Sequence, residues 1–298
     1  MESMSFTSFR RYNYVIDHQK SMEVPIYDNH LHLSPSGRNI VAAKEYEAAG
    51  GTGMTLVTLP YKEVSIDEGE DFMKGYRITL SLAEKVREST SLKVNVAVGP
   101  YPVTLLWLAE RFGLEKAEAM MMKGMEDAAA LVADGKANAI GEIGRPHFPV
   151  DDVYMESSNR ILLRGMELAR ELDCPVIIHS ESEPSTYESL GHIADEAGLP
   201  REMVVKHSSL PYVREDENRG LMPSIPSSRS LIKEALSKGD RFMVETDFID
   251  DPDKPEAIMA VTTVPKRIKG YLQSGGMTEE QVHRICGDIP LHLYERKR

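Results

Sequence analysis

Short apolar runs alternate with longer amphipathic segments along nearly the whole chain, and this alternation restricts the possible folds more than any other feature. The runs have the length of strands, and the intervals between them are long enough for helices. Eight strands are predicted, at residues 25–33, 52–59, 92–99, 138–143, 175–180, 202–208, 221–225 and 241–247. Helices are predicted at 38–49, 67–89, 102–135 (as two helices), 153–173, 185–198, 227–238, 254–274 and 278–294. This order predicts an α/β fold with a parallel sheet.

Eight strand–helix units in 298 residues favour a single-domain (β/α)8 TIM barrel over a doubly wound open sheet. A barrel has polar residues at the carboxyl ends of strands all round the chain, as here, whereas an open sheet gathers them at one switch point. Pro223 and Pro226 interrupt the seventh strand and argue against it, because proline cannot donate to a ladder. The barrel domain is expected to span residues 24–298, with residues 1–23 as an N-terminal arm.

Six side chains of the types that bind metals lie at the ends of these strands. His30 and His32 are two residues apart on one strand, so they point to the same face, together with Asp28. Glu245 and Asp247 share a face of the last strand in the same way. In chain order the six residues are His30, His32, Glu142, His179, His207 and Asp247. The set predicts a metal centre at the carboxyl ends of the barrel strands and hence a metal-dependent hydrolase.

Each of these residues has a simpler explanation when it is considered alone. Glu142 could form a salt bridge with Arg145, and Asp247 could cap the following helix. A single histidine at a strand end is more often a core or rim residue than a ligand. The metal interpretation rests on the whole ordered set, since a carboxylate in an apolar strand needs a cation or a hydrogen-bond partner.

The ordered pattern of an HxH pair, GEIG, two strand-end histidines and ETD resembles that of the TatD-like metal-dependent hydrolases of the amidohydrolase superfamily. The resemblance covers roughly residues 25–292 and marks the chain as a divergent branch. It implies catalytic roles for Glu142 and Asp247, with Asp247 taking the proton of the attacking water. The implied ligands are His30, His32 and Asp247 for one divalent metal ion and His179 and His207 for a second, with Glu142 bridging the two.

The chain departs from this family at positions near the expected substrate. Tyr101, in the stretch Gly-Pro-Tyr-Pro at 99–102, stands where the family usually has a histidine. Arg145 follows the GEIG motif where the family has an acidic residue, and glutamates rather than an arginine follow His179. Arg145 and His147 are therefore candidate substrate anchors. The departures remove expected phosphate contacts and leave the metal ligands complete.

The resemblance implies a phosphodiesterase or DNase type of hydrolase that acts on a small-molecule or nucleic-acid phosphoester. A carboxylic ester, lactone or amide hydrolase is the alternative, because the expected phosphate contacts differ, and a non-catalytic scaffold is the third reading. One or two divalent ions are expected, and the mixed donors do not distinguish among zinc, manganese, magnesium, iron and nickel. Asp28, Ser180, Ser208 and Glu245 are expected to orient ligand imidazoles.

Two further segments have predicted roles. Trp107 is expected to pack a helix, with a place in the pocket wall as the alternative. The irregular stretch 210–230 is a candidate lid over the active site. The methionines at 120–122 predict packing in the core or in a homo-oligomer. The formal net charge of −12 argues mildly against tight binding of nucleic acid, and no apolar run has the ~20 residues that span a membrane. With no secretory signal at the N-terminus, a cytoplasmic protein is expected.

Overall fold

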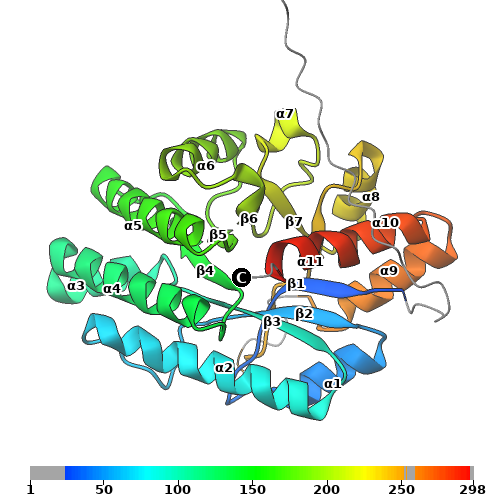
Figure 1. Ribbon diagram of the computed structural model, residues 1–298, viewed down its shortest axis with the longest axis horizontal. Helices are drawn as coiled ribbons and strands as arrows, with labels where there is room; N and C mark the ends of the chain where they lie inside the picture. Colours follow the sequence, from blue (N-terminus) through cyan, green and yellow to red (C-terminus); the bar gives the residue numbers. More distant parts are fainter. Residues whose placement is uncertain (1–23, 252, 254–258, 296–298) are drawn as a thin grey trace, which may run out of the picture.

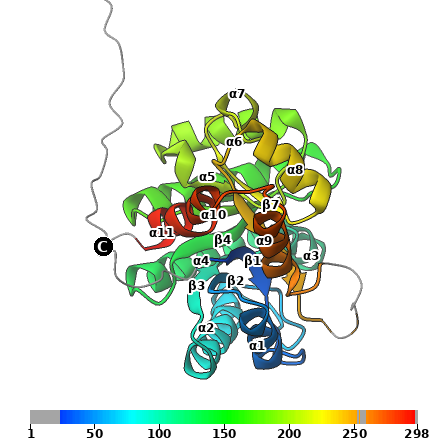
Figure 2. The same ribbon diagram turned by 90° about the vertical axis from the view of Figure 1, so that its right-hand side faces the viewer.

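The computed structural model describes residues 24–251, 253 and 259–295, so the N-terminal arm expected at residues 1–23 lies outside the described residues. Within them, nine parallel strands form one sheet in the order β8-β7-β6-β5-β4-β3-β2-β1-β9. Helices surround these strands in both views, which gives the (β/α)8 barrel that was predicted (Figure 1, Figure 2). The strands are β1 (Tyr27–His32), β2 (Gly53–Val57), β3 (Lys93–Val98), β4 (Ala139–Gly144), β5 (Val176–His179), β6 (Val204–Lys206), β7 (Met222–Pro226), β8 (Met243–Glu245) and β9 (Phe248–Ile249).

The barrel closes through its last strand, which is divided into two pieces. β8 pairs with β7, and β9 follows two residues later and pairs with β1. At the break, the amide of Asp247 donates to the carbonyl of His30 at 2.9 Å. Asp247 has a left-handed φ of 51°, which aspartate tolerates better than most residues. The predicted eighth strand is therefore present, and its interruption lies at a candidate ligand.

The seventh strand forms despite its two prolines. β7 pairs with β6 through Met222 and Pro223, and with β8 through Ser224, Ile225 and Pro226. Proline lacks the N–H group but retains its carbonyl, so it weakens a ladder without abolishing it. The prolines are thus compatible with a short strand between two partners.

Eleven α-helices connect or flank the described strands. Their bounds are α1 (Ile40–Ala48), α2 (Phe72–Ser89), α3 (Thr104–Phe112), α4 (Leu114–Ala133), α5 (Asp152–Glu171), α6 (Pro184–Ala197), α7 (Glu215–Asn218), α8 (Arg229–Lys238), α9 (Thr263–Gln273), α10 (Glu279–His283) and α11 (Ile289–Tyr294). Gly113, with a φ of 84°, separates α3 from α4 and confirms the two helices predicted over 102–135. The described helices include none that is long and apolar enough to cross a membrane.

Two helix boundaries differ from the predictions in an informative way. The helix predicted from residue 67 begins at Phe72, because the carboxylate of Asp71 accepts the amides of Asp67 and Glu68 and holds a tight turn instead. The helix predicted at 278–294 starts with a capping box between Thr278 and Gln281. It then passes through a π-helical turn at 284–288 before α11. Local side-chain hydrogen bonds shift the first of these boundaries, and neither difference changes the fold.

The core consists of the inner and outer faces of the strands and the helix faces that cover them. Strand residues such as Leu31, Leu56, Val96 and Ile177 are inaccessible to solvent. Glycine at 144 is required by geometry, because a Cβ there would lie 2.0 Å from the carbonyl oxygen of His179 and its φ is +140°. β4 and β5 can therefore approach closely where their polar ends meet.

Candidate metal centre

The six predicted ligands come together at the carboxyl ends of the strands. Two of them are on β1, Glu142 is on β4, and the other three lie at or just beyond the ends of β5, β6 and β8. Two groups of three donors, each within 4.8 Å of one another, could hold a metal ion. The first group is His30, His32 and Asp247, and the second is His30, Glu142 and His207. These two groups omit His179, which reaches the centre through Glu142.

The first group joins the two histidines of β1 to Asp247. The Nε2 atoms of His30 and His32 are 3.1 Å apart. One carboxylate oxygen of Asp247 lies 3.5 Å from Nε2 of His32 and 3.9 Å from Nε2 of His30. The other oxygen lies 3.9 Å from Nε2 of His207. These donors thus face one point at the break between β8 and β9.

Glu142 occupies the middle of the second group. Its Oε1 atom lies 2.7 Å from Nδ1 of His179, 3.4 Å from Nε2 of His207 and 4.0 Å from Nε2 of His30. The side chain is almost completely buried, so it is a carboxylate surrounded by imidazoles from three other strand ends. The simpler pairing with Arg145 does not occur, because Arg145 lies 2.7 Å from Glu181 instead.

The charges of the centre depend strongly on one another. Burial alone would raise the pKa of Glu142, but His179, His207 and His30 hold it well below its usual value. Asp247 behaves similarly: burial opposes ionisation, and the neighbouring imidazoles lower its pKa to about 2. Both carboxylates are therefore ionised at neutral pH and available as ligands.

The imidazoles are held by partners on their far sides. Nδ1 of His32 lies 2.9 Å from the carbonyl oxygen of Val57, which leaves Nε2 directed at the centre. Nδ1 of His207 lies 2.9 Å from Glu245, as expected from the sequence. Burial lowers the pKa of His207, but the carboxylates of Glu245, Asp247 and Glu142 outweigh it and raise the pKa to about 9. Burial holds the pKa of His30 well below its usual value.

Three other residues that were expected to orient imidazoles contact different groups. Asp28 accepts hydrogen bonds from the amide and hydroxyl of Thr246, at 3.0 and 2.7 Å, and so holds the chain just before Asp247. The hydroxyl of Ser180 donates to the carbonyl of Glu181 at 3.2 Å. Ser208 contributes its amide, which donates to Glu245 at 2.8 Å. Of these, Ser208 supports the imidazole of His207 indirectly, through its hydrogen bond to Glu245.

The two candidate substrate anchors have different surroundings. Arg145 is buried, and its guanidinium also donates to Ser189 at 3.0 Å, so the group points away from the pocket over the centre. His147 lines that pocket, and its Nδ1 lies 2.8 Å from Nε2 of His179. The geometry therefore favours His147 over Arg145 for contact with a bound molecule.

A pocket of about 440 Å³ opens over the centre and includes Tyr101 and Trp107 in its walls. The ring of Tyr101 stands edge-on to His179, with 5.1 Å between ring centroids. Of the two roles predicted for Trp107, the structure favours pocket lining over helix packing, since the side chain is 50% exposed and lines the pocket. No residue of the candidate lid 210–230 is among the described residues that line this pocket.

Sequence reasoning missed several buried polar residues that support the centre. Lys206 donates to the carbonyls of His207 and Ser180 at 2.6 and 3.3 Å, and burial lowers its pKa to about 8. Its place at the end of the apolar run MVVK was a usable signal. Ser224 donates to Glu245 and accepts from Asn29 at 2.9 Å. No sequence pattern marks Ser224 or Asn29, because the partners of these two residues are far away in the chain.

The donor set fits a divalent metal ion. Imidazole nitrogens and carboxylate oxygens together suit ions such as zinc, manganese, iron or nickel. The Nε2 atoms of His30 and His32 face each other at 3.1 Å, which is an arrangement that a shared cation stabilises. A (β/α)8 barrel with such donors at its strand ends is the architecture of a metal-dependent hydrolase.

Comparison with known proteins places the chain in a family of this class. The family model described as TatD related DNase matches residues 27–295, and the chain belongs to this family. A protein of Methanocaldococcus jannaschii is 33% identical over 277 residues, which cover 91% of this chain and 96% of that protein. The chain is thus a TatD-family metal-dependent hydrolase, as the resemblance implied.

Solved structures show the same fold at lower sequence identity. A TatD homologue from Escherichia coli is 20% identical, with a TM-score of 0.64, over 93% of this chain and 100% of that one. A mutant organophosphorus hydrolase from Deinococcus radiodurans is 17% identical, with a TM-score of 0.60, over 91% and 93% of the two chains. The barrel is therefore shared by a TatD homologue and an organophosphorus hydrolase, so the fold alone does not identify the substrate.

Proposed function

We propose that the centre holds two divalent metal ions. His30, His32 and Asp247 would bind one ion, and His179 and His207 the other. The observation that carries this proposal is the position of Glu142, whose Oε1 atom lies within 4.0 Å of imidazole nitrogens from both sets. A carboxylate in this position can bridge two cations.

Divalent ions in such a centre lower the pKa of bound water and polarise the oxygen of the scissile bond. The residues of the chain have separate tasks around this chemistry. Asp247 is ionised and partly exposed, so its carboxylate would accept the proton of the attacking water. Glu245 keeps the imidazole of His207 in place, and the carbonyl of Val57 does the same for His32.

The preferred substrate class is a phosphodiester, in a small molecule or a nucleic acid. The match to a family described as TatD related DNase supports this proposal. His147 and Tyr101 line the pocket and would contact the phosphoester or its leaving group. Burial raises the pKa of Tyr101, so its hydroxyl keeps its proton and can donate a hydrogen bond.

One observation favours a second candidate, the hydrolysis of an uncharged carboxylic ester, lactone or amide. Lys62 is the one lysine or arginine among the described residues that line the pocket. Its ammonium group already lies 3.3 Å from Asp251 and 2.8 Å from Asp253. A phosphodiester anion would therefore find little positive charge beyond the metal ions themselves, whereas a neutral ester needs none.

Metal content and substrate screening together test the proposal. Inductively coupled plasma mass spectrometry on the wild type and on the double variant His30→Ala/His32→Ala should show near-stoichiometric metal that falls in the variant. The wild type should then hydrolyse bis(p-nitrophenyl) phosphate or single-stranded DNA in a metal-dependent reaction. Turnover of p-nitrophenyl acetate or lactones alone would support the second candidate. Equal metal content in both proteins would refute the ligand assignment.

A further inference from the structure

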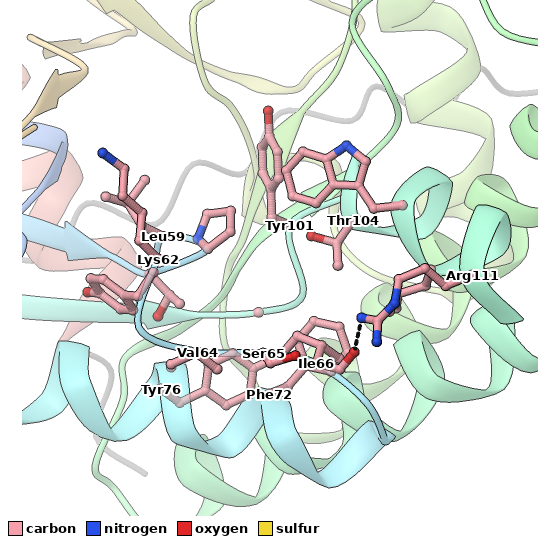
Figure 3. Close-up of a pocket in the computed structure, with 17 residues that line it drawn as sticks. Leu59, Lys62, Val64, Ser65, Ile66, Phe72, Tyr76, Tyr101, Thr104 and Arg111 are labelled. Atoms are coloured by element: carbon pink, nitrogen blue, oxygen red, sulfur yellow. Dashed lines mark hydrogen bonds between the residues drawn. The ribbon is translucent and has the colours of Figure 1, made fainter. Parts of the chain in front are cut away.

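A second cavity of about 360 Å³, here called the aromatic chamber, adjoins the pocket over the metal centre. It lies between the segment 58–66, the start of α2 and helix α3 (Figure 3). Five of the side chains that line it are aromatic: Tyr61, Phe72, Tyr76, Tyr101 and Trp107. The last of these is the only tryptophan in the chain. The chamber therefore offers broad apolar ring surfaces to a bound group.

The polar groups of the chamber wall are largely satisfied by the protein. The hydroxyl of Tyr61 bonds to that of Thr79 at 2.9 Å, and the hydroxyl of Tyr76 donates to the carbonyl of Gly124 at 3.0 Å. The guanidinium of Arg111 pairs with Asp67, and Figure 3 shows it beside Ile66, whose carbonyl it contacts at 3.0 Å. A charged or strongly polar ligand group would lose its hydrogen bonds to water in the chamber and would gain few hydrogen bonds from the chamber wall.

The chamber and the metal pocket share one wall. Tyr101 and Trp107 line both cavities, as does the stretch 59–62. The ring of Tyr101 also stands edge-on to the ligand His179, and Figure 3 shows its hydroxyl pointing away from Phe72. A molecule whose reacting bond lies at the metal centre can thus extend a substituent past Tyr101 toward the chamber.

We propose that the aromatic chamber binds an uncharged aryl group of the substrate and so sets the specificity of the enzyme. The inference rests on the proposed function in placing the scissile ester at the metal centre. An aryl group is favoured over an extended polar group because the walls combine flat rings with satisfied polar atoms. An unsubstituted aryl ring has few hydrogen-bonding groups to desolvate, so it loses little on entering such a site.

Gly75 offers a way to fill the chamber without disturbing the metal pocket. It lines the chamber from α2 and is not among the residues that line the metal pocket. A Cβ at this position would meet Tyr61 at 3.8 Å and Leu59 at 3.9 Å, which are ordinary contact distances. Gly75→Ala is therefore a conservative control, whereas Gly75→Met places a long side chain in the space that the aryl group would occupy.

Binding is measured first, by titrating metal-free protein with the uncharged probe p-nitroanisole and following Trp107 fluorescence. The wild type and Gly75→Ala should show saturable quenching, and Gly75→Met should bind about tenfold more weakly or not at all. Circular dichroism will show whether Gly75→Met folds. If it does not, Gly75→Leu, which has a shorter side chain, replaces it in the test. The proposal would be overturned if the wild type showed no quenching, or if a folded Gly75→Met or Gly75→Leu variant showed the same quenching as the wild type.

Activity is measured second, as the ratio of kcat/KM for a phenyl ester to that for the corresponding methyl ester. Intrinsic reactivity cancels when this ratio is compared between variants. Gly75→Met should lower the ratio about tenfold, and Gly75→Ala, which adds a single methyl group, should lower it far less. An unchanged ratio in Gly75→Met contradicts the specificity role. Probe binding without any metal-dependent turnover would refute the proposed function and leave the chamber assignment supported, so the two failures are distinguishable.

Discussion

The pocket over the metal centre and the aromatic chamber share Tyr101, yet the centre and the chamber are built from different parts of the fold. His30, His32 and Glu142 of the centre are on barrel strands. Phe72 and Gly75 of the chamber are on α2, outside the barrel. Strands held on both sides by parallel neighbours keep their end groups in place, whereas loops and helix starts can vary without disrupting the barrel. The strand ends thus suit the chemistry, and the outer elements suit the choice of substrate.

The electrostatics of the two regions differ in the same way. In the centre, carboxylates and imidazoles shift one another's pKa values, and Glu142 would be very costly to bury without its neighbours. In the chamber, polar atoms such as the hydroxyls of Tyr61 and Tyr76 already have partners. Mutations should therefore change metal binding and rate in one region, and mainly substrate preference in the other.

The largest expected effect is that of Glu142→Ala. It removes the carboxylate that would bridge two metal ions, so turnover should fall on the order of 1,000-fold or more. Circular dichroism should show the fold retained. The matched control is Glu171→Ala, which removes an exposed glutamate at the end of α5 and should leave the rate unchanged. A wild-type rate and metal content in Glu142→Ala would contradict the bridging role.

A smaller effect is expected from Glu245→Gln, which keeps the size of the side chain and removes its charge. Glu245 contacts Nδ1 of His207 from behind, so its loss should weaken metal affinity by about 10- to 100-fold. Isothermal titration with manganese measures the change directly. A metal affinity equal to that of the wild type would show that Glu245 does not tune the metal ligand His207. Its hydrogen bonds with Ser224 and the Ser208 amide would then serve only the stability of the fold.

The metal affinity should change about tenfold for each pH unit below the pKa of His207. His207 has a pKa of about 9 in the metal-free protein, and a ligand imidazole must lose its proton. Affinity should therefore fall about tenfold for each unit that the pH decreases below 9, and level off above 9. Because Glu245 contributes to this raised pKa, Glu245→Gln should move the pH at which the affinity levels off to below 9. A slope that is flat between pH 7 and 9 in the wild type would rule out His207 as a ligand that binds with proton loss.

The smallest effect belongs to the chamber control Gly75→Ala. Alanine restricts the unfolded chain and favours the helix, so the free energy of unfolding should rise by about 0.5 kcal/mol. Thermal unfolding of the metal-free protein measures the gain, and the metal content should match that of the wild type. A loss of stability would mean that the methyl group does not fit beside Tyr61 and Leu59.

Much of the metal centre could be predicted because, in a parallel barrel, a residue at the end of a strand in the sequence also lies at one end of the barrel. Strands alternating with helices place all strand carboxyl ends on one side, so ligands such as His30, Glu142 and His207 were expected to meet. The partners of those ligands could not be predicted in this way. Asp28 and Thr246 are 218 residues apart, and only the closure of the barrel brings β1 beside β8.

The sequence by itself determined the class of fold, the family and the ligand candidates, because these follow from local periodicity and from residue types at strand ends. The tertiary structure decided which imidazole nitrogen faces each carboxylate, that Arg145 pairs with Glu181, and that Trp107 lines a cavity. Such features depend on side-chain packing between elements distant in the chain. Many side chains from distant parts of the chain must fit together in the same closely packed space, so no short stretch of sequence determines this packing.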